Sequence, residues 1–290
     1  MDWARQGAGW PNREASRFVD SRPHRWHLQI MGPADAPRVL LLHGAGGATH
    51  SWRGVLPDLA RDHRVMAPDL PGHGFTRLGA RWRSGLPAMA EDAAALMAAE
   101  DFAPDVIVGH SAGAAVALRL ALDMKRPPRL VIGFNAALGN FPGLAGWLFP
   151  IMAKMLAANP LTALVASRLS TEASVARLIE GTGSRIDAEG LALYGRLISD
   201  RAHVDGALRM MAQWSLDRLN ADLPRLELPA LLIAAEKDLA VPPETSEEAA
   251  GRIKAGRAER WPGLGHLAHE EAPERAAEAI RTAAKAYSAG

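Results

Sequence analysis

Cysteine is absent from this sequence of 290 residues. Disulfide bonds, thiolate metal ligands and a cysteine nucleophile are therefore excluded. An excess of charge of one sign is lacking as well, because 33 Lys and Arg residues nearly balance 32 Asp and Glu residues. The formal net charge of +1 gives no electrostatic reason to expect a nucleic-acid partner.

Long apolar runs are also missing. The most apolar stretch, residues 143–156, is interrupted by Pro150 and Lys154 and is too short to cross a bilayer. It is nevertheless apolar enough for peripheral contact with a membrane or with a greasy ligand. The N-terminal residues MDWAR lack the basic head and the apolar run of a signal peptide, so we expect a cytoplasmic protein.

Short strands alternate with helices in the first half of the chain. A hairpin is predicted over residues 17–30, with its turn at 22–24. Continuous apolar runs, typical of strands buried on both faces of a parallel sheet, lie at 39–42, 63–67, 105–108 and 130–134. Helix-like stretches separate them at 51–61, 87–100 and 112–123. This alternation predicts a doubly wound, mostly parallel sheet.

The alternation stops between residues 138 and 219, where only helix-like patterns broken by Gly and Pro occur. Strand and helix patterns resume with segments at 230–234, 244–253, 258–261 and 273–287. The simplest organisation is one α/β core, made of residues 1–137 and 220–290, into which residues 138–219 are inserted as a helical cap.

The strongest chemical signal is the pentapeptide 109–113, Gly-His-Ser-Ala-Gly, between a buried strand and a small-residue helix. This is the G-x-S-x-G pattern in its strand–turn–helix setting. Ser111 would stand at the tip of a sharp turn, where the two glycines let strand and helix approach closely. The helix N-terminus there favours developing negative charge. Ser111 is the predicted nucleophile.

A serine hydroxyl is inert at neutral pH unless a base removes its proton, and the sequence offers ten histidines. His266 is preferred because it lies in a Gly-rich loop after the last predicted strand and completes the chain order Ser, Asp, His. His269 competes with it, but this residue falls on the following helix beside Glu270 and Glu271.

The imidazole in turn needs a carboxylate to orient it. Asp238 follows the strand at 230–234, at the sheet edge where function gathers in parallel sheets. Glu236 is an alternative acid that lies closer to this strand. The loop after the strand at 130–134 can also house the acid in such folds, but it carries Asn135, which favours Asp238.

Acyl transfer also requires donors for an oxyanion, usually two backbone N–H groups. Ala112, directly after the nucleophile, supplies one, and Ala45 in the Gly-rich loop 43–47 supplies the other. This loop lacks the lysine and the glycine spacing of nucleotide-binding loops, and the histidines show no metal-ligand spacing. We therefore predict no cofactor and no metal. The Pro-Gly turn at 69–74 is interpreted as the pocket floor.

We expect the substrate pocket to draw on the first Gly-rich loop, the nucleophile turn and the insertion, with His43, Gly44, His110, Trp147, Met211 and Trp214 as its lining. The Met- and aromatic-bearing stretches of the insertion suit a greasy pocket. They equally suit ordinary helix packing, and the sequence leaves both interpretations open.

With these residues in place, the chain resembles the α/β-hydrolase superfamily across most of its length. The matching features run from the loop at His43 and Gly44 through residues 109–113 and Asp238 to His266. The resemblance implies a mostly parallel sheet of the eight-stranded type, with helices on both faces and an inserted helical cap. It also implies a serine hydrolase acting on an ester-type bond, but it says little about the substrate.

A narrower resemblance, to the magnesium-chelatase accessory hydrolases of bacteriochlorophyll biosynthesis, covers nearly the whole chain. It includes the insertion, which generic hydrolases would not share. Matching stretches lie at 10–19, 26–27, 44–52, 69–76, 109–115, 182–184, 203–208 and 263–271. The resemblance implies a role around magnesium insertion, with a tetrapyrrole or another apolar ester as substrate and chelatase subunits as partners. A non-catalytic porphyrin-binding or chelatase-assisting role and a generic carboxylesterase-like activity, unconnected to pigment, are the alternatives.

Overall fold

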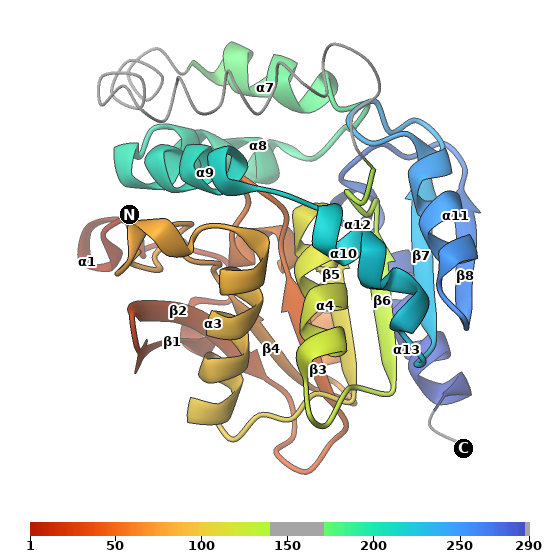
Figure 1. The fold of residues 1–290 in the computed structure, drawn as a ribbon. Helices are drawn as coiled ribbons and strands as arrows, with labels where there is room; N and C mark the ends of the chain where they lie inside the picture. Colours follow the sequence, from red (N-terminus) through yellow and green to blue (C-terminus); the bar gives the residue numbers. More distant parts are fainter. Residues whose placement is uncertain (140–170, 288–290) are drawn as a thin grey trace.

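The computed structural model describes residues 1–139 and 171–287 of the chain. Its centre is one eight-stranded sheet in the order β1-β2-β4-β3-β5-β6-β7-β8 (Figure 1). β1 and β2 form the predicted hairpin, β2 is antiparallel to β4, and the other neighbouring strands are parallel. The strands are β1 (Ser16–Ser21), β2 (His24–Met31), β3 (Arg38–Leu42), β4 (Arg64–Pro68), β5 (Val106–His110), β6 (Leu130–Phe134), β7 (Ala230–Ala235) and β8 (Gly256–Trp261).

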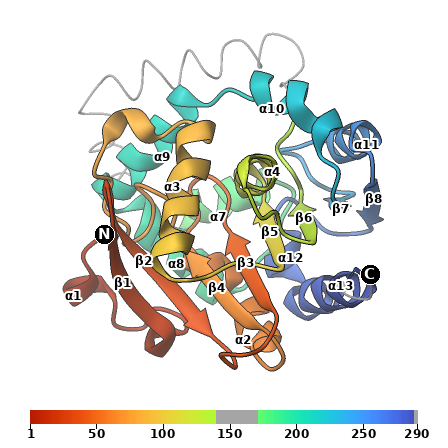
Figure 2. The same ribbon diagram turned by 60° about the horizontal axis from the view of Figure 1, so that its bottom comes forward.

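Helices cover both faces of this sheet (Figure 2). Successive residues of a buried strand serve opposite faces: Leu40 packs on the side of α3, α4 and α11, whereas Val39 and Leu41 pack on the side of α2 and α13. The predicted doubly wound, mostly parallel sheet is therefore confirmed. The core helices are α1 (Trp3–Gln6), α2 (Val55–Leu59), α3 (Leu86–Ala99), α4 (Ala112–Asp123), α11 (Pro243–Arg252), α12 (Ala268–Glu271) and α13 (Pro273–Ala286).

The helix predicted over 51–61 is wrong in its extent. A 3₁₀ turn, η2 (Thr49–Trp52), comes first, and the short helix α2 follows after Gly54. A side chain at Gly54 would place its Cβ 2.7 Å from the Cβ of Pro273. The glycine thus lets this segment pack directly against the start of α13, which a periodicity pattern does not reveal.

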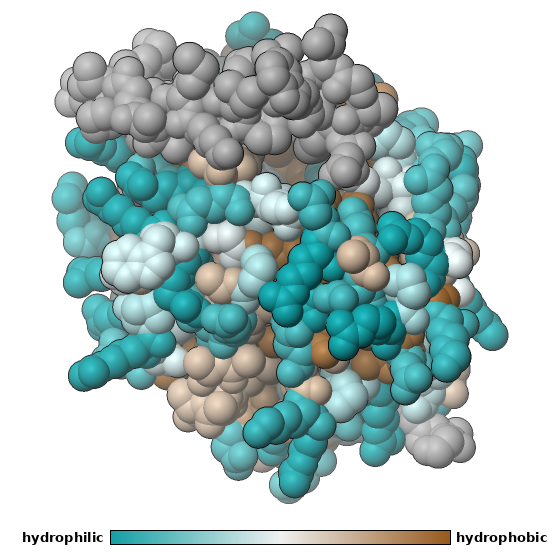
Figure 3. Space-filling model, in the orientation of Figure 1, coloured by the Kyte–Doolittle hydropathy of each residue, from teal (hydrophilic) through white to brown (hydrophobic). Residues whose placement is uncertain are grey.

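Hydrophilic side chains cover most of the face shown in Figure 3, and hydrophobic residues appear there only in small areas between them. The edge strand β8 carries Arg257, Glu259 and Arg260 on its exposed positions, and charges of this kind discourage pairing with another sheet edge. In the described part of the chain, no helix is long and apolar enough to cross a membrane.

Within the predicted insertion, the described residues from 171 onward form helices. α7 (Glu172–Glu180), α8 (Ala188–Ile198) and α9 (Arg201–Gln213) lie above the carboxyl ends of the parallel strands (Figure 1). α10 (Asp217–Asp222) instead packs with the core through Leu219, although the predicted boundary at 219/220 falls inside it. The division of the chain at 137/138 and 219/220 stays a prediction.

Helix α9 rests directly on the loop that follows β4. A Cβ at Gly206 would lie 2.0 Å from the carbonyl oxygen of Gly72, so the two backbones touch. Beside this contact, the Nδ1 atom of His203 accepts from the Gly74 N–H at 3.0 Å, and its Nε2 atom lies 3.1 Å from the Gly46 carbonyl oxygen. One neutral imidazole thereby joins α9 to two loops of the core.

A buried ion pair also connects α8 with the core. The Arg53 guanidinium lies 2.5 Å from Glu270 and 2.8 Å from Asp187, and the Tyr194 hydroxyl donates to Glu270 at 2.7 Å. Burial raises the pKa of Glu270 to about 7, against the opposing effects of the Arg53 charge and the Tyr194 hydrogen bond. Glu270 therefore changes its protonation near neutral pH.

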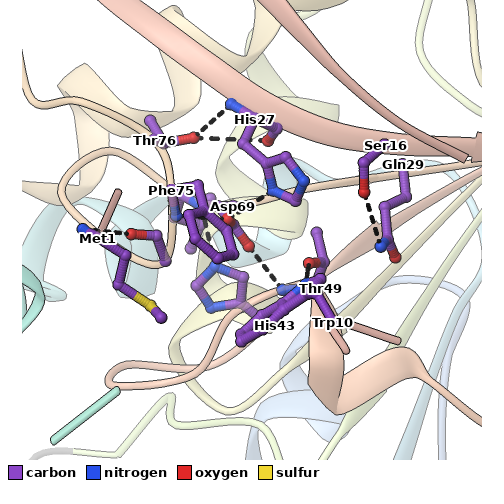
Figure 4. A network of polar contacts seen from close by, with 12 residues as sticks. Met1, Trp10, Ser16, His27, Gln29, His43, Thr49, Asp69, Phe75 and Thr76 are labelled. Carbon is purple, nitrogen blue, oxygen red and sulfur yellow. Dashed lines mark hydrogen bonds and ion pairs between the residues drawn. The ribbon is translucent and has the colours of Figure 1, made fainter. Parts of the chain in front are cut away.

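An Asp69 side chain, buried after β4, connects three further segments (Figure 4). Its carboxylate accepts from His27 Nδ1 at 2.7 Å, from the Thr49 N–H at 2.6 Å and from the Phe75 N–H at 2.8 Å. Burial by itself would raise the pKa of Asp69, but His27 and the Phe75 N–H hold it well below its ordinary value. The turn at 69–74 therefore joins strand β2, the start of η2 and the segment at Phe75 through one carboxylate.

We expect Asp69→Ala to lower the free energy of unfolding by at least about 3 kcal/mol, because three buried donors lose their acceptor at about 1–3 kcal/mol each. Urea unfolding monitored by circular dichroism measures the loss. Asp35→Ala, at an exposed turn, is the matched control and should change stability by less than about 0.5 kcal/mol. Equal effects of the two substitutions would contradict the role assigned to Asp69.

A second prediction concerns the pH dependence of stability. The pKa of Glu270 is about 7 in the folded protein and about 4.3 for an unfolded glutamate. Between these two pH values the folded protein keeps a proton on Glu270 that the unfolded chain has lost. Its contribution to stability is complete below about pH 4.3 and is lost as the pH rises towards 7. Relative to Glu270→Gln, the wild-type free energy of unfolding should fall across this window. Parallel profiles for the two proteins, measured by urea unfolding, would rule this out.

Candidate active site

The turn between β5 and α4 holds Ser111 in an unusual backbone conformation, with φ 51° and ψ −117°. A non-glycine residue adopts positive φ only where the surroundings enforce it. Here Gly113 lies so close to β3 that a Cβ would approach the Leu42 carbonyl oxygen to 2.3 Å. The Ser111 N–H also donates to the Phe134 carbonyl at 2.9 Å. The packing of β3, β6 and α4 therefore forces this conformation and sets the serine at the carboxyl edge of the sheet.

Asp238 and His266 form a buried pair at the same edge. The Nδ1–H of His266 donates to Asp238 Oδ2 at 2.7 Å. The other carboxylate oxygen accepts from the N–H groups of Ala240 and Val241, each at 2.8 Å. These bonds fix the carboxylate and leave Nε2 of His266 free to accept a proton. Glu236, the alternative acid, is exposed.

The competing histidine is placed as a packing residue. His269 is fully buried, and its ring stacks on Trp52 and His110 with centroids 4.5 and 4.4 Å apart. Neither ring nitrogen has a hydrogen-bond partner within the described residues, and burial lowers the pKa of His269 well below its ordinary value. Such an imidazole remains neutral and offers no oriented proton acceptor.

His110 directly precedes Ser111 and contacts the loop that carries His266. Its Nε2 atom lies 2.8 Å from the carbonyl oxygen of His266, and the two rings are 4.8 Å apart. Burial is the main cause that lowers the pKa of His110 well below its ordinary value, so the ring is neutral and donates this bond. The turn that carries Ser111 thus contacts the segment that carries His266.

Asn135 belongs to this arrangement of residues, although the sequence alone indicated only that its position holds no acid. It follows β6 with φ 49°, is buried, and donates from Nδ2 to Asp238 Oδ2 at 2.7 Å. The same oxygen accepts from His266, so Asn135 orients the carboxylate towards the imidazole. A polar residue at the carboxyl end of a neighbouring parallel strand was the available signal.

A turn from the insertion also holds the two loops that carry the acid and the histidine. The Thr182 carbonyl accepts from the N–H of Leu239 at 3.1 Å and from the N–H of His266 at 3.3 Å, while Ser184 Oγ accepts from the Leu267 N–H at 2.8 Å. Gly183, between them, has φ +82°, and a Cβ there would lie 1.9 Å from the Lys237 carbonyl oxygen. Each residue of the stretch 182–184 thus contributes to holding the loops that carry Asp238 and His266.

The Gly-rich loop 43–47 lies against the nucleophile turn. A Cβ at Gly44 would be 3.1 Å from the Cβ of Ser111. The backbone N–H groups of Ala45 and Ala112 have no hydrogen-bond partner in the described part of the chain. His43 is wholly buried beneath the loop, where it accepts from the Leu70 N–H at 2.8 Å, so its predicted place in the pocket lining is wrong.

A cavity of about 430 Å³ opens between this edge and the helices of the insertion. Of the residues predicted to line a substrate pocket, Gly44, His110 and Met211 line this cavity. Trp214 is not among the lining residues and packs instead against the hydrophobic core on the face of the sheet that α3, α4 and α11 cover. Trp147 lies outside the described residues. Further lining comes from apolar side chains of α7, α8 and α9 and from the histidine loop, namely Leu178, Ile179, Ile198, Val204, Ala207, Leu208 and Leu267.

Three histidines line this cavity, but only one of them pairs with a carboxylate. His110 and His203 bond to backbone groups and are kept neutral mainly by burial, whereas His266 bonds to Asp238. Among residues 1–139 and 171–287, no group of three or more His, Asp or Glu side chains is arranged to hold a metal ion. The edge of the sheet thus presents Ser111, an imidazole paired with a carboxylate and two N–H groups without a partner among the described residues, and His110 and His266 of these segments line the apolar cavity.

Comparison with known proteins agrees with the fold. The family model described as alpha/beta hydrolase fold matches residues 37–273. The chain is 46% identical over 275 residues to the magnesium-chelatase 30 kDa subunit of Rhodobacter capsulatus, covering 94% of this chain and 96% of that protein. It is 27% identical over 240 residues to a putative carbamate hydrolase of Pseudomonas savastanoi, covering 77% of this chain and 84% of that protein.

Solved structures share the fold at low sequence identity. A putative lipase from Acinetobacter baumannii superposes with a TM-score of 0.79 and 19% identity over 94% of this chain and 91% of that one. A thermophilic esterase from Thermogutta terrifontis superposes with a TM-score of 0.75 and 23% identity, over 94% of this chain and 98% of that one. The chain therefore belongs to the α/β-hydrolase fold family and, within it, to the family of the magnesium-chelatase 30 kDa subunit.

Proposed function

We propose that this protein is a serine hydrolase that cleaves an ester-type bond in a substrate with an apolar acyl or alcohol part. The observation that carries the proposal is the strained Ser111 turn beside a His266 imidazole whose other nitrogen is bound to buried Asp238. A strained backbone is maintained at a cost in stability, so its presence beside an oriented imidazole supports a chemical role. The apolar cavity at this point supports an apolar substrate.

In the proposed mechanism, Nε2 of His266 takes the proton of the Ser111 hydroxyl as the oxygen attacks the substrate carbonyl. The N–H groups of Ala45 and Ala112 hold the resulting oxyanion. His266 then gives its proton to the leaving oxygen, and an acyl-enzyme remains on Ser111. A water molecule, deprotonated by His266, releases the acid. Asp238 fixes the imidazole tautomer and stabilises its charged form.

The biological setting comes from the relative named as a magnesium-chelatase subunit. We propose that the substrate is a tetrapyrrole intermediate of bacteriochlorophyll biosynthesis, or a compound that accompanies it, and that chelatase subunits are partners. A second candidate follows from the same name, because a chelatase subunit can assist magnesium insertion by holding the porphyrin without hydrolysing it. A generic carboxylesterase activity is the third, supported by the hydrolase names of more distant relatives.

Ser111→Ala should lower the turnover of short p-nitrophenyl esters by a factor on the order of 10⁴ or more and abolish labelling by a fluorophosphonate probe. Ser51→Ala is the matched control, because Ser51 lines the same cavity and its hydroxyl has no partner among the described residues. Wild-type protein that takes up no probe would argue against the hydrolase.

The same variant separates the first two candidates in cells. A strain that lacks the protein and receives Ser111→Ala should fail to make pigment at normal protein levels if hydrolysis is the function. Normal pigment with the variant would favour the porphyrin-holding role. Rapid ester turnover with no porphyrin binding would favour the generic esterase.

His266→Ala should lower turnover by a similar factor, because no other imidazole beside the cavity is oriented by a carboxylate. His269→Phe, which keeps a ring between Trp52 and His110, should retain most of the activity. Burst and steady-state kinetics on the folded fraction of each variant measure both effects. Comparable losses for the two variants would refute the assignment of His266 as the base.

A further inference from the structure

A second hollow, of about 750 Å³, lies on the other side of helix α9 from the catalytic cavity. Val204, Ala207 and Leu208 of this helix line the catalytic cavity, whereas Ala202 and Asp205 line the second hollow. The remaining wall comes from α1, β1, β2 and the segment 72–81. The volume is within the range of about 300–1,000 Å³ that small-molecule sites occupy.

Three exposed arginines in this wall lack acidic partners. Arg25, Arg77 and Arg81 form no ion pair with any residue that the structure describes. The Arg77 N–H donates to the Arg25 carbonyl at 2.9 Å, and the two residues face each other across an isolated antiparallel bridge. Like charges in directly opposite positions destabilise a pair of strands, so the fold keeps an unfavourable arrangement here.

Acidic side chains of the same wall are already engaged elsewhere. Asp200 accepts from the first N–H groups of α9 and lies 3.3 Å from the Met1 amine. Asp205 pairs with Arg209 at 2.8 Å, and Asp2 accepts from the Ala4 N–H at 2.9 Å. None of them pairs with the three arginines, whose guanidinium groups remain available to an anion.

The hollow also has an aromatic side. Trp3 packs edge-on against Phe18 and Phe75, with ring centroids 5.7 and 4.8 Å apart, and all three residues line the hollow. The Arg25 guanidinium lies 4.9 Å above the Phe18 ring. Stacking of this kind orients the planar group and leaves its N–H edge free for a two-point bond to a carboxylate or phosphate.

We propose that this hollow binds a small molecule with a flat apolar body and at least one oxyanion group, carboxylate or phosphate. The aromatic side receives the body, and Arg25, Arg77 and Arg81 bind the anionic groups. The site is separate from Ser111 and does not depend on hydrolysis. The proposal therefore goes beyond the proposed function, and binding measurements alone can test it.

Isothermal titration calorimetry at low ionic strength tests this with naphthalene dicarboxylate, with naphthyl phosphate and, on Ser111→Ala protein so that it is not hydrolysed, with the neutral dimethyl ester of the dicarboxylate. Wild-type protein should bind at least one of the anions, and the anion preferred identifies the group recognised. The triple variant Arg25→Gln, Arg77→Gln, Arg81→Gln should bind it at least about tenfold more weakly. Ser111→Ala should bind it as the wild type does.

The matched control is Arg61→Gln, Arg129→Gln, Arg218→Gln, which removes the same charge from exposed positions outside the hollow. Its affinity should stay within about twofold of wild type. Equal weakening by the two triple variants, or equal binding of the neutral ester, would overturn the proposal. So would the absence of binding by either anion to wild-type protein.

Discussion

The site depends on the backbone of Ser111, which the structure holds at positive φ although the residue is not a glycine. That conformation persists because α4 begins against β3 at Gly113 and because the Ser111 N–H is tied to the end of β6. Strands β3, β5 and β6 are parallel neighbours, so their carboxyl ends bring the Gly-rich loop 43–47, Ser111 and Asn135 into one row. The backbone conformation of Ser111 thus depends on how β3, β6 and α4 pack against one another.

Burial divides the histidines of this edge into two kinds. His110, His203 and His269 are enclosed by protein, and the loss of hydration lowers the pKa of each, which makes them neutral parts of the framework. His266 instead has a carboxylate partner that is itself held by Asn135 and by backbone N–H groups. Among the three cavity-lining histidines His110, His203 and His266, His266 is therefore the one whose ring is paired with a carboxylate.

Much of the fold and of the candidate site could be predicted, because each feature leaves a local trace: apolar runs for buried strands, G-x-S-x-G for the turn, and a loop after a strand for Asp238 and His266. The contacts that were missed join residues far apart in the chain. The position of Asn135 after a parallel strand indicates a place at this edge but does not identify Asp238 as its partner, and nothing near Thr182 indicates that its carbonyl accepts from the His266 N–H. The burial of His43 and the packing of Trp214 likewise follow from tertiary neighbours and not from residue type.

The turn at 182–184 has a consequence for how a substrate enters. Its carbonyl and hydroxyl hold the backbone of His266 and Leu267, so the segment that covers the cavity also aligns the base. Any opening that lifted this turn would release the imidazole loop at the same time. In the proposed mechanism, an ester that reached Ser111 while this turn was lifted would meet the serine without an aligned proton acceptor.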